Sequence, residues 1–297
     1  MKTGGPVYAG AKLTLSFRVL GRRGDGYHDV EGVMAALTAP ADKVEVVVSG
    51  APFLEVTGVV DDVPTDDTNL AVRAVDAFYA ELGMDRPPLG VRLEKSIPTG
   101  AGLGGGSADA AAVLACLNDL SLDRRLADDA LARVAASLGS DVPACLRGGL
   151  NRVSGRGEVV EPLAFVGGWW AVVAVPEISL ATADVYAAWD ALDAPASSRV
   201  VAAPPVLGEV AATLVNDLEP AALVVAPELE EFRAAFERVA GLPPVLAGSG
   251  SAYFVVTDDG ARAEAIARAA ADFARLSIAA APSEAGCWSS TASGAPD

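Results

Sequence analysis

Histidine and cysteine are scarce in this chain, and their scarcity excludes one large class of metal sites. The 297 residues include one histidine, His28, and three cysteines, with no Cys-x-x-Cys pair. A structural zinc site needs four ligands, which would take all four of these residues, and no Cys-x-x-Cys pair brings two of them together, so we expect no Cys/His zinc centre. The odd cysteine count without paired spacing is typical of a protein kept in the reducing cytoplasm.

Long hydrophobic runs are also missing. The strongly apolar run Trp169–Val175 is far shorter than the ~20 apolar residues that a membrane helix requires, and no other run reaches that length. The first residues, Met1–Pro6, lack the apolar segment of a signal peptide. We therefore expect a cytoplasmic protein that does not enter or bind a membrane.

Positive charge is in short supply. The chain has 22 Lys and Arg residues against 39 Asp and Glu residues, which gives a formal net charge of −17 at pH 7. A surface of this sign repels nucleic acid and anionic lipid, so we expect no nucleic-acid partner. If the protein handles phosphate groups, it needs local positive charge from a few Lys or Arg side chains and from backbone N–H groups.

The composition is that of a folded protein with two domains. Apolar residues make up 52% of the chain and charged residues 21%, which excludes a disordered chain. At 297 residues, two domains are favoured over one. Strand and helix patterns follow one another without strict alternation, which favours an α+β fold. We expect an N-terminal domain over 1–160, a second domain over 161–285 and a disordered tail over 286–297.

Hydrophobic patterns place the expected elements along the chain. Apolar alternation predicts a strand over Val7–Leu20, and a charged turn, Gly21–Gly26, follows it. The segment Asp66–Asn69 is typical of a helix N-cap, so a helix is expected from Leu70. Further strands are predicted over 44–48, 53–60, 148–153, 169–175, 245–246, 252–256 and 276–280, helices over 123–138, 183–192, 227–240 and 261–273, and loop residues at 194–198 and 204–205.

The most informative segment is glycine-rich. Five of the seven residues from Gly100 to Gly106 are glycine. An expected strand, Val91–Leu93, precedes them, and an expected helix, Ala110–Leu117, follows. A glycine turn that leads into a helix presents unpaired backbone N–H groups and the positive end of the helix dipole. The segment therefore predicts an anion site, and the missing Cβ atoms allow a phosphate group to approach the backbone closely.

Other interpretations of the glycine loop fit less well. No Lys-Ser or Lys-Thr follows the glycines, which excludes a Walker A motif. Gly100, Gly102 and Gly105 match G-x-G-x-x-G, the fingerprint of nicotinamide-dependent oxidoreductases. That fingerprint needs an acid about 20 residues further on at a strand end, whereas Asp119 and Asp123 lie at a helix end and in a turn. A flexible surface loop is the remaining alternative.

Four further polar features each have an ordinary structural explanation when taken alone. Lys12 lies in an apolar strand, where it is costly unless it is paired, functional or extends to solvent. Asp141, in Ser-Asp-Val-Pro, has the position of a helix N-cap. Gly26–His28 follows a basic turn and could lie at the surface. Gly248–Ser251, between two expected strands, is either a phosphate-binding nest or a turn.

Taken together and in this order, these features resemble the GHMP kinase superfamily over nearly the whole chain. The motif Asp25–His28, with the lysine strand, resembles the members that phosphorylate a cytidine diphosphate derivative of methylerythritol, in the methylerythritol phosphate route to isoprenoids. The segments that carry the resemblance are Ala11–Leu15, Asp25–His28, Gly102–Ser107 and Asp141–Pro143, with further similarity at Asp67–Leu70, Ser154–Glu158 and Asn216–Pro220.

The resemblance implies a fold and a set of ligands. The fold would be an N-terminal domain like the second domain of ribosomal protein S5, followed by a ferredoxin-like C-terminal domain, with the active site in the cleft between them. The ligands would be ATP with Mg²⁺ and a small-molecule cytidine diphosphate derivative, whose 2-hydroxyl receives the γ-phosphate. The protein would be a monomer or a homodimer.

The resemblance also implies roles for single residues. Asp141 would accept the proton of the hydroxyl, with Lys12 beside it to offset the developing negative charge. His28 would bind the cytosine, held between the rings of Tyr27 and Tyr186. The residues that would bind the nucleotide are Pro98, Gly100, Gly102, Leu103, Gly104, Gly105, Gly106 and Ser107. The Mg²⁺ ligands are left open, with Ser107 and Asp109 as candidates.

Thr14, which would contact the substrate, is the main departure from the family pattern. These kinases usually have asparagine two residues after the lysine. Thr14 therefore leaves open a GHMP kinase that acts on another small alcohol, such as a polyol, a sugar or homoserine. A non-catalytic nucleotide-binding module on the same fold is a further alternative. Such a module needs neither Lys12 nor Asp141, so the presence of both favours an enzyme.

Overall fold

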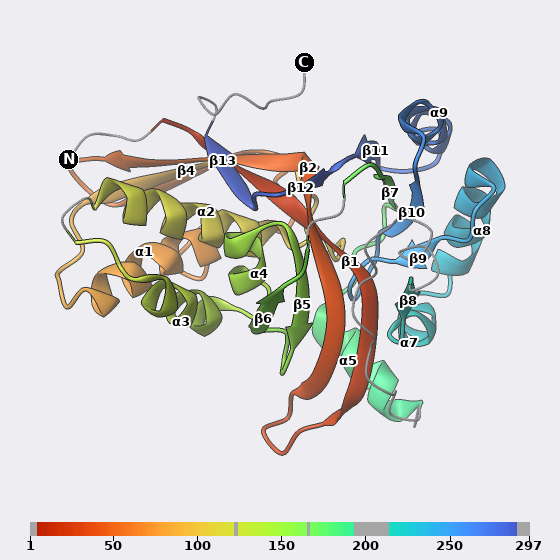
Figure 1. Cartoon of the computed structure of the whole chain (residues 1–297), viewed down its shortest axis with the longest axis horizontal. Coiled ribbons are helices and arrows are strands. Elements are labelled where there is room, and N and C mark those ends of the chain that lie inside the picture. The colour runs from red at the N-terminus through yellow and green to blue at the C-terminus, as the bar shows by residue number, and fades with distance from the viewer. Residues whose placement is uncertain (1–4, 122–123, 165–166, 193–213, 290–297) are drawn as a thin grey trace.

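The computed structural model describes residues 5–121, 124–164, 167–192 and 214–289. Mixed strands and helices form two β-sheets with helices packed against them, which confirms the predicted α+β class (Figure 1). None of the helices in these ranges has the length and apolar character needed to span a bilayer. The loops predicted at 194–198 and 204–205 lie outside the described residues.

The first sheet is built around two long antiparallel strands, β1 (Val7–Arg22) and β2 (His28–Val48). The sequence predicted only the end of β2, because residues 30–37 are buried on both faces of the strand and show no alternation of apolar and polar residues. Seven further strands complete the sheet: β3 (Phe53–Gly58), β4 (Leu89–Lys95), β5 (Leu150–Ser154), β6 (Val159–Pro162), β8 (Val215–Asn216), β12 (Pro282–Ser283) and β13 (Cys287–Ser289).

The pairing of β1 with β2 is irregular on both sides of the segment from Lys12 to Thr14. The register shifts between Gly10 and Lys12 and again between Thr14 and Ser16. Bulges of this kind bend a strand and redirect its side chains, and they recur beside functional sites. Lys12 and Thr14 are two residues apart, so their side chains project from the same face of β1.

Four helices lie on one side of the first sheet (Figure 1): α2 (Gly105–Leu120) and α4 (Val142–Arg147) pack against its strands, and α1 (Leu70–Glu81) and α3 (Asp128–Leu138) pack on these helices. The predicted cap of α1 is confirmed, because the side chain of Asn69 accepts a hydrogen bond from the Ala71 N–H. The predicted start of α3 is wrong. The Asn118 side chain accepts a hydrogen bond from the Leu126 N–H and donates one to its carbonyl, and residues 124–127 are not helical.

The second sheet has four antiparallel strands in the order β11-β7-β10-β9. Helix α9 packs on it and α8 packs on α9, on the side of the molecule away from the first sheet (Figure 1). The remaining elements are β7 (Trp170–Val175), α5 (Thr182–Ala191), α7 (Glu219–Val225), α8 (Leu229–Ala240), β9 (Val245–Leu246), β10 (Tyr253–Thr257), α9 (Gly260–Ala270) and β11 (Leu276–Ala280).

The two sheets share buried apolar side chains. Leu13 and Leu15 of β1 belong to the same buried cluster as Val173 of β7 and Phe254 of β10. Strands β8, β12 and β13, from late in the chain, pair with β1 or β2 of the first sheet. These contacts fix the position of the second sheet relative to β1. The predicted domain boundary near residue 160 stays a prediction.

The end of the chain differs from the expectation of a disordered tail over 286–297. That prediction is wrong for Cys287–Ser289, which form β13 and pair with Val7–Ala9 of β1. The Gly286 carbonyl also accepts a hydrogen bond from the Gly10 N–H. The free edge of β1 has backbone groups that need partners, and this segment supplies them. Residues 290–297 lie outside the described residues.

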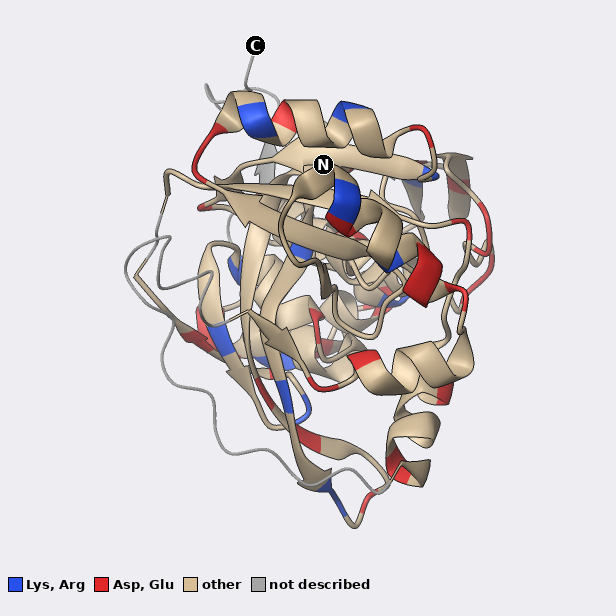
Figure 2. Ribbon diagram, turned by 90° about the vertical axis from the view of Figure 1, so that its right-hand side faces the viewer, with Lys and Arg blue, Asp and Glu red and all other residues tan. Residues whose placement is uncertain are grey.

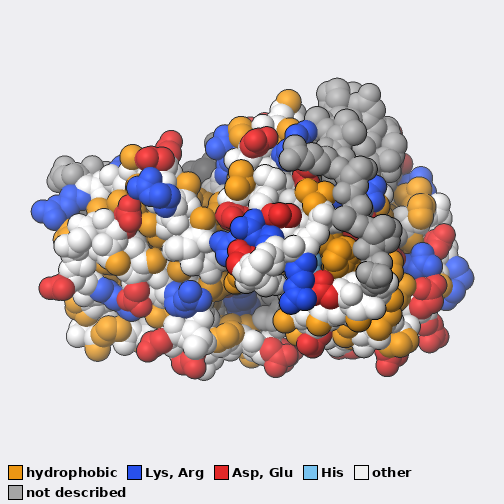
Figure 3. Space-filling view, turned by 90° about the horizontal axis from the view of Figure 1, so that it is seen from below, with side chains coloured by type: hydrophobic (Ala, Val, Ile, Leu, Met, Phe, Trp, Pro, Cys, Tyr) orange, Lys and Arg blue, Asp and Glu red, His pale blue; other side chains and the backbone are white. Residues whose placement is uncertain are grey.

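Charged residues of both signs are spread over the molecule. In Figure 2 the acidic residues occur on helices, strands and loops alike rather than on one element. On the face shown in Figure 3, basic and acidic side chains lie beside one another. The net negative charge of the chain is therefore distributed, and local positive charge has to come from particular side chains and backbone groups.

Candidate active site

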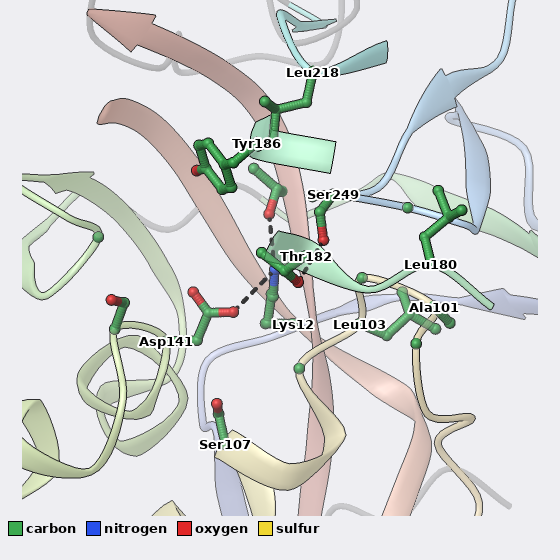
Figure 4. Close-up of a pocket in the computed structure, with 18 of the residues that line it drawn as sticks. Lys12, Ala101, Leu103, Ser107, Asp141, Leu180, Thr182, Tyr186, Leu218 and Ser249 are labelled. Carbon is green, nitrogen blue, oxygen red and sulfur yellow. Dashed lines mark hydrogen bonds and ion pairs between the residues drawn. The ribbon is translucent and has the colours of Figure 1, made fainter. Parts of the chain in front are cut away.

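A cavity of about 850 Å³ lies between β1, the glycine loop, the start of α5 and the turn at residues 248–250. Segments from both halves of the chain form its walls, and Figure 4 shows several of their side chains directed toward one another. Apart from Asp109, a candidate Mg²⁺ ligand, the site residues predicted from the sequence all line this cavity: Lys12, Thr14, Tyr27, His28, Pro98, Gly100, Gly102, Leu103, Gly104, Gly105, Gly106, Ser107, Asp141 and Tyr186.

Lys12 is the central cation of the cavity. Its Nζ atom lies 3.2 Å from Asp141 Oδ2 and donates a hydrogen bond of 3.2 Å to Thr14 Oγ1 (Figure 4). The lysine is only 6% exposed, so it does not extend to solvent along the strand edge. A buried cation of this kind requires a paired anion. The carboxylate and the hydroxyl hold the ammonium at a defined point in the cavity.

Asp141 has the backbone position of an N-cap but does not act as one. It precedes α4, yet its side chain makes no cap hydrogen bond to that helix. The carboxylate instead faces Lys12, and the side chain is 29% exposed. A carboxylate that is both accessible from the cavity and beside a buried cation can accept a proton from a bound alcohol.

The glycine loop delivers the N-terminus of α2 to the cavity. Gly104 is the N-cap residue, in the left-handed region at φ 72°, and no side chain caps the helix. A Cβ atom on Gly104 would lie 2.7 Å from Lys12 Cγ, and a Cβ atom on Gly102 would lie 1.9 Å from the Ala247 carbonyl oxygen. Only glycine fits these two positions. The first N–H groups of α2 remain available to an anion in the cavity.

The loop is fastened to strands on both sides. The Lys12 N–H donates to the Leu103 carbonyl at 3.0 Å. Just before β10, the N–H groups of Ser251 and Ala252 donate to the carbonyls of Gly100 and Ala101 at 3.1 and 3.2 Å. These bonds use the loop's carbonyl groups, which leaves its N–H groups for a ligand and fixes the loop before any ligand binds.

A second glycine turn lies opposite the first. Gly248, Ser249 and Gly250 all line the cavity, and the Ser249 hydroxyl lies 2.9 Å from the Thr182 hydroxyl at the start of α5. The Asn216 side-chain amide donates to the carbonyls of Leu246 and Gly248 at 2.8 and 2.6 Å. The sequence had left this segment as either a phosphate-binding nest or a turn; it forms a turn in the cavity wall, and phosphate binding there stays a prediction.

A buried cluster of charged side chains lies next to the glycine loop, where β4 leads into it. Lys95, at the end of β4, pairs with the carboxylates of Asp42 and Asp109, and all three side chains are at most 3% exposed. Asp42 Oδ1 also accepts hydrogen bonds from the N–H groups of Ser96 and Ile97, at 2.6 and 2.9 Å. The cluster therefore joins β2, β4 and α2 where the chain enters the loop.

Asp109 is one of the two candidate Mg²⁺ ligands, and its placement excludes that role. Its Oδ2 atom is bound to Lys95, and the side chain is fully enclosed rather than directed into the cavity. Burial raises the pKa of the Asp109 carboxyl to about 7, although the Lys95 ammonium partly offsets the effect. Burial alone would lower the pKa of Lys95, but the two carboxylates outweigh it and raise that pKa.

Tyr27, His28 and Tyr186 line the cavity beyond Lys12. The ring of His28 stacks on that of Tyr186, with centroids 4.7 Å apart and planes inclined by 24°. Tyr27 is 54% exposed, and the Arg156 guanidinium lies 4.8 Å from its ring centroid. Burial, and secondarily the nearby Asp141 carboxylate, raise the pKa of Tyr186, so its hydroxyl stays protonated at neutral pH.

Sequence reasoning missed several polar residues of this site. Asp190 accepts a hydrogen bond from His28, Asn216 holds the second glycine turn, and Lys95 with Asp42 supports the glycine loop. Asn216 belongs to a segment that resembled the GHMP kinases, which was its only signal. Asp42, Lys95 and Asp190 lie in different elements, and nothing in their spacing indicates that they lie near the glycine loop or His28.

The residues of the cavity fit Mg²⁺ bound mainly through a nucleotide. Within the described residues, no group of three or more His, Cys, Asp or Glu side chains could hold a metal ion. Mg²⁺ in nucleotide sites is bound by one or two side-chain oxygens together with phosphate oxygens and water. Ser107, in the first turn of α2, offers such an oxygen in the cavity wall.

Family models match both halves of the chain. The model described as "GHMP kinases N terminal domain" matches residues 69–149, and the model described as "GHMP kinases C terminal" matches residues 206–276. The first match contains the glycine loop and Asp141. The second contains Asn216 and the turn at 248–250.

Curated proteins are similar to this chain over most of its length. The 4-diphosphocytidyl-2-C-methyl-D-erythritol kinase of Nitratidesulfovibrio vulgaris strain DP4 is 36% identical over 258 residues, which cover 84% of this chain and 88% of that protein. The protein of the same name from Pelotomaculum thermopropionicum is 38% identical over 259 residues, which cover 84% and 88%.

Solved structures share the fold. A crystal structure of 4-(cytidine 5'-diphospho)-2C-methyl-D-erythritol kinase has a TM-score of 0.77 at 32% identity and covers 93% of this chain and 98% of its own. A homoserine kinase from Cytophaga hutchinsonii has a TM-score of 0.70 at 18% identity, covering 97% and 98%, which shows the fold alone.

Proposed function

The chain belongs to the GHMP kinases, in the family of the 4-diphosphocytidyl-2-C-methyl-D-erythritol kinases. From this membership we propose that the protein transfers the γ-phosphate of ATP to the 2-hydroxyl of 4-diphosphocytidyl-2-C-methyl-D-erythritol. The membership confirms the resemblance drawn from the sequence motifs. The reaction would be a step of the methylerythritol phosphate route to isoprenoids.

The observation that carries the proposal is the contact between Lys12 and Asp141 beside the glycine loop. Phosphoryl transfer is mostly positioning and stabilisation of charge. Asp141 accepts the proton of the attacking hydroxyl as the new P–O bond forms. Lys12, 3.2 Å away, offsets negative charge on the hydroxyl oxygen and on the transferred phosphoryl group. A module that only bound nucleotide would need neither residue.

The glycine loop binds the triphosphate of ATP in this proposal. The N–H groups at the start of α2, from Gly105 to Ser107, donate to phosphate oxygens, and the dipole of α2 adds favourable potential. Ser107 is the side chain that would hold Mg²⁺, which would neutralise charge on the phosphate oxygens. The protein supplies the fixed backbone donors, while the nucleotide supplies most of the metal's ligands.

The cytidine end of the substrate lies against Tyr186 and Tyr27. A slot with aromatic walls and one polar contact gives a base both orientation and specificity. His28 provides the polar contact. Thr14, whose hydroxyl accepts from Lys12, stands where the family usually has asparagine and keeps a polar group in contact with the catalytic lysine.

Incubation of the pure protein with ATP, Mg²⁺ and 4-diphosphocytidyl-2-C-methyl-D-erythritol tests the proposal. The expected products are ADP and the 2-phosphate of the substrate, identified by mass spectrometry and ³¹P NMR. ADP release with homoserine, a sugar or a polyol, but not with the cytidine substrate, would favour another GHMP kinase activity. ATP binding without transfer to any alcohol would favour a binding module, and stabilisation by NAD but not ATP would favour an oxidoreductase.

A further inference from the structure

The ring of His28 has one of its two nitrogen atoms committed to a carboxylate. Its Nε2 atom lies 2.7 Å from Asp190 Oδ1, on α5. We propose that Asp190 is a positioning residue that fixes the tautomer of His28, so that the site selects a cytosine base over a uracil base. The proposal rests on the proposed function, because it concerns how the cytidine end of that substrate is recognised.

The carboxylate of Asp190 is itself held in place. Its second oxygen lies 3.4 Å from the Arg22 guanidinium, and the side chain is 27% exposed. The edge of the Trp189 indole packs against His28, with ring centroids 5.4 Å apart and planes at 85°. The imidazole is 7% exposed and is therefore confined by a stacked ring, a perpendicular ring and a hydrogen bond.

Asp190 determines which nitrogen of His28 carries the proton. A carboxylate only accepts hydrogen bonds, so Nε2 must be the protonated nitrogen. In the neutral ring Nδ1 then has a lone pair and accepts. Among the described residues, Nδ1 has no hydrogen-bond partner, and both His28 and Asp190 line the cavity. Nδ1 is thus available as an acceptor for a ligand.

The stacking geometry places this acceptor in the plane of a bound base. Ring planes in contact are about 3.5–4.0 Å apart, so centroids at 4.7 Å mean that His28 covers Tyr186 with a lateral offset. A base stacked on the remaining part of the same face of Tyr186 lies edge to edge with His28. Its hydrogen-bonding edge and Nδ1 then meet in one plane.

The chemistry of the two bases decides which is accepted. Cytosine has a donor, the exocyclic amine, at its 4-position, whereas uracil has an acceptor, a carbonyl oxygen, there. The Nδ1 lone pair pairs with the amine and opposes the carbonyl. When two buried acceptors face one another, both lose their hydrogen bonds to water without gaining a partner. Binding of the wrong base is then weakened by more free energy than the loss of one contact would cost. Asp190 therefore determines base specificity without touching the base.

The experiment compares kcat/KM for 4-diphosphocytidyl-2-C-methyl-D-erythritol and for its uridine analogue. Wild type should prefer the cytidine substrate by at least ~100-fold, since a site built for one hydrogen-bonding pattern strongly rejects the analogue that leaves its polar groups unpaired. In Asp190→Asn the amide can either accept from His28 or donate to it, so both tautomers form. The preference should fall by at least ~10-fold, chiefly through a higher KM for the cytidine substrate.

Asp184→Asn is the matched control, because Asp184 is an exposed carboxylate on the same helix that does not line the cavity. It should leave the cytidine-to-uridine ratio unchanged. An equal loss of rate on both substrates in Asp190→Asn would mean a merely structural role and would overturn the inference. No turnover of the cytidine substrate by wild type would instead refute the proposed function.

A measurement on the wild-type protein avoids any dependence on the folding of the variant. The chain has a single histidine, so ring-¹⁵N-histidine labelling gives one unambiguous pair of nitrogen signals. At pH 8 the Nε2 signal should be that of a protonated nitrogen and the Nδ1 signal that of an unprotonated one. A proton on Nδ1 in that spectrum would overturn the inference.

Discussion

The ammonium of Lys12 lies 3.2 Å from the carboxylate of Asp141, although one residue lies in the first strand and the other just before α4. The two elements meet because α2 and α4 pack together against the first sheet. Both residues line the cavity, and Lys12 also donates a hydrogen bond to Thr14. The first prediction therefore concerns this pair.

Replacing Asp141 with asparagine should remove the proton acceptor and keep the shape of the site. We expect kcat to fall at least ~100-fold, the low end of general-base effects. ATP affinity should change little, because the phosphates bind at the glycine loop. Steady-state kinetics with a coupled ADP assay and calorimetric titration of ATP measure the two quantities. A variant with near wild-type kcat would show that another group accepts the proton.

Replacing Gly102 with alanine should destabilise the protein by about 2–4 kcal/mol. The alanine would be strained in the left-handed backbone region, and its Cβ atom would force the turn at residues 248–250 to shift. The new Cβ would lie 1.9 Å from the Ala247 carbonyl oxygen, at φ +75°. Gly106→Ala is the control, since its Cβ would lie 3.6 Å from Leu70 Cδ1 without a positive φ. Denaturant unfolding of both variants measures the difference, and equal stabilities would contradict the close approach.

The pH dependence of stability should carry a contribution from Asp109. Burial raises its folded pKa to about 7 from 3.8, and Lys95 offsets only part of that effect. The folded state therefore holds this proton more tightly than the unfolded state, and stability falls as pH rises from about 4 to about 7. In Asp109→Asn this decline should be missing.

The measurement is the free energy of unfolding of wild type and Asp109→Asn across that pH range. The free energy of unfolding of Asp109→Asn should increase relative to that of wild type by at least ~1 kcal/mol as pH rises. Asp119→Asn removes an exposed carboxylate, 76% accessible, from the same helix and should leave the slope unchanged. Parallel curves for wild type and Asp109→Asn would mean that Asp109 is ionised throughout.

Replacing Tyr186 with alanine should remove the surface on which the base stacks. Stacking of a base on an aromatic ring contributes about 1–3 kcal/mol, so KM for the cytidine substrate should rise at least ~10-fold. Tyr186→Phe keeps the ring and should stay within ~3-fold of wild type. KM for ATP should not change in either variant. A phenylalanine variant as impaired as the alanine variant would assign the effect to the hydroxyl instead.

The glycine loop and the pair of Lys12 and Asp141 could be predicted from the sequence, because each leaves a local signal. Glycines in succession mark a backbone that must approach something closely. Lys12 is unusual in an apolar strand, and Asp141 lies in a recognisable motif. The sequence alone could not decide between their structural and functional explanations, and the common cavity that they line now favours the functional one.

The buried cluster of Asp42, Lys95 and Asp109 could not be predicted in the same way. Asp42 lies in the part of β2 where buried and partly exposed residues alternate, so the strand period places its side chain on the buried face but does not show which cation it meets there. The partners of such a cluster are set by tertiary packing, which composition and periodicity do not encode. The same holds for Asp190, whose function depends on the side chain that happens to lie opposite it.

The bonds from Ser251 and Ala252 to the glycine loop have a consequence for synthesis of the chain. A ribosome produces the loop long before it produces these two residues. A nascent chain that has just emerged with its first sheet still lacks the amides that fix the loop. Affinity for nucleotide should therefore appear late in translation, once β10 has been made and docked, and a shortened translation product should compete poorly for cellular ATP.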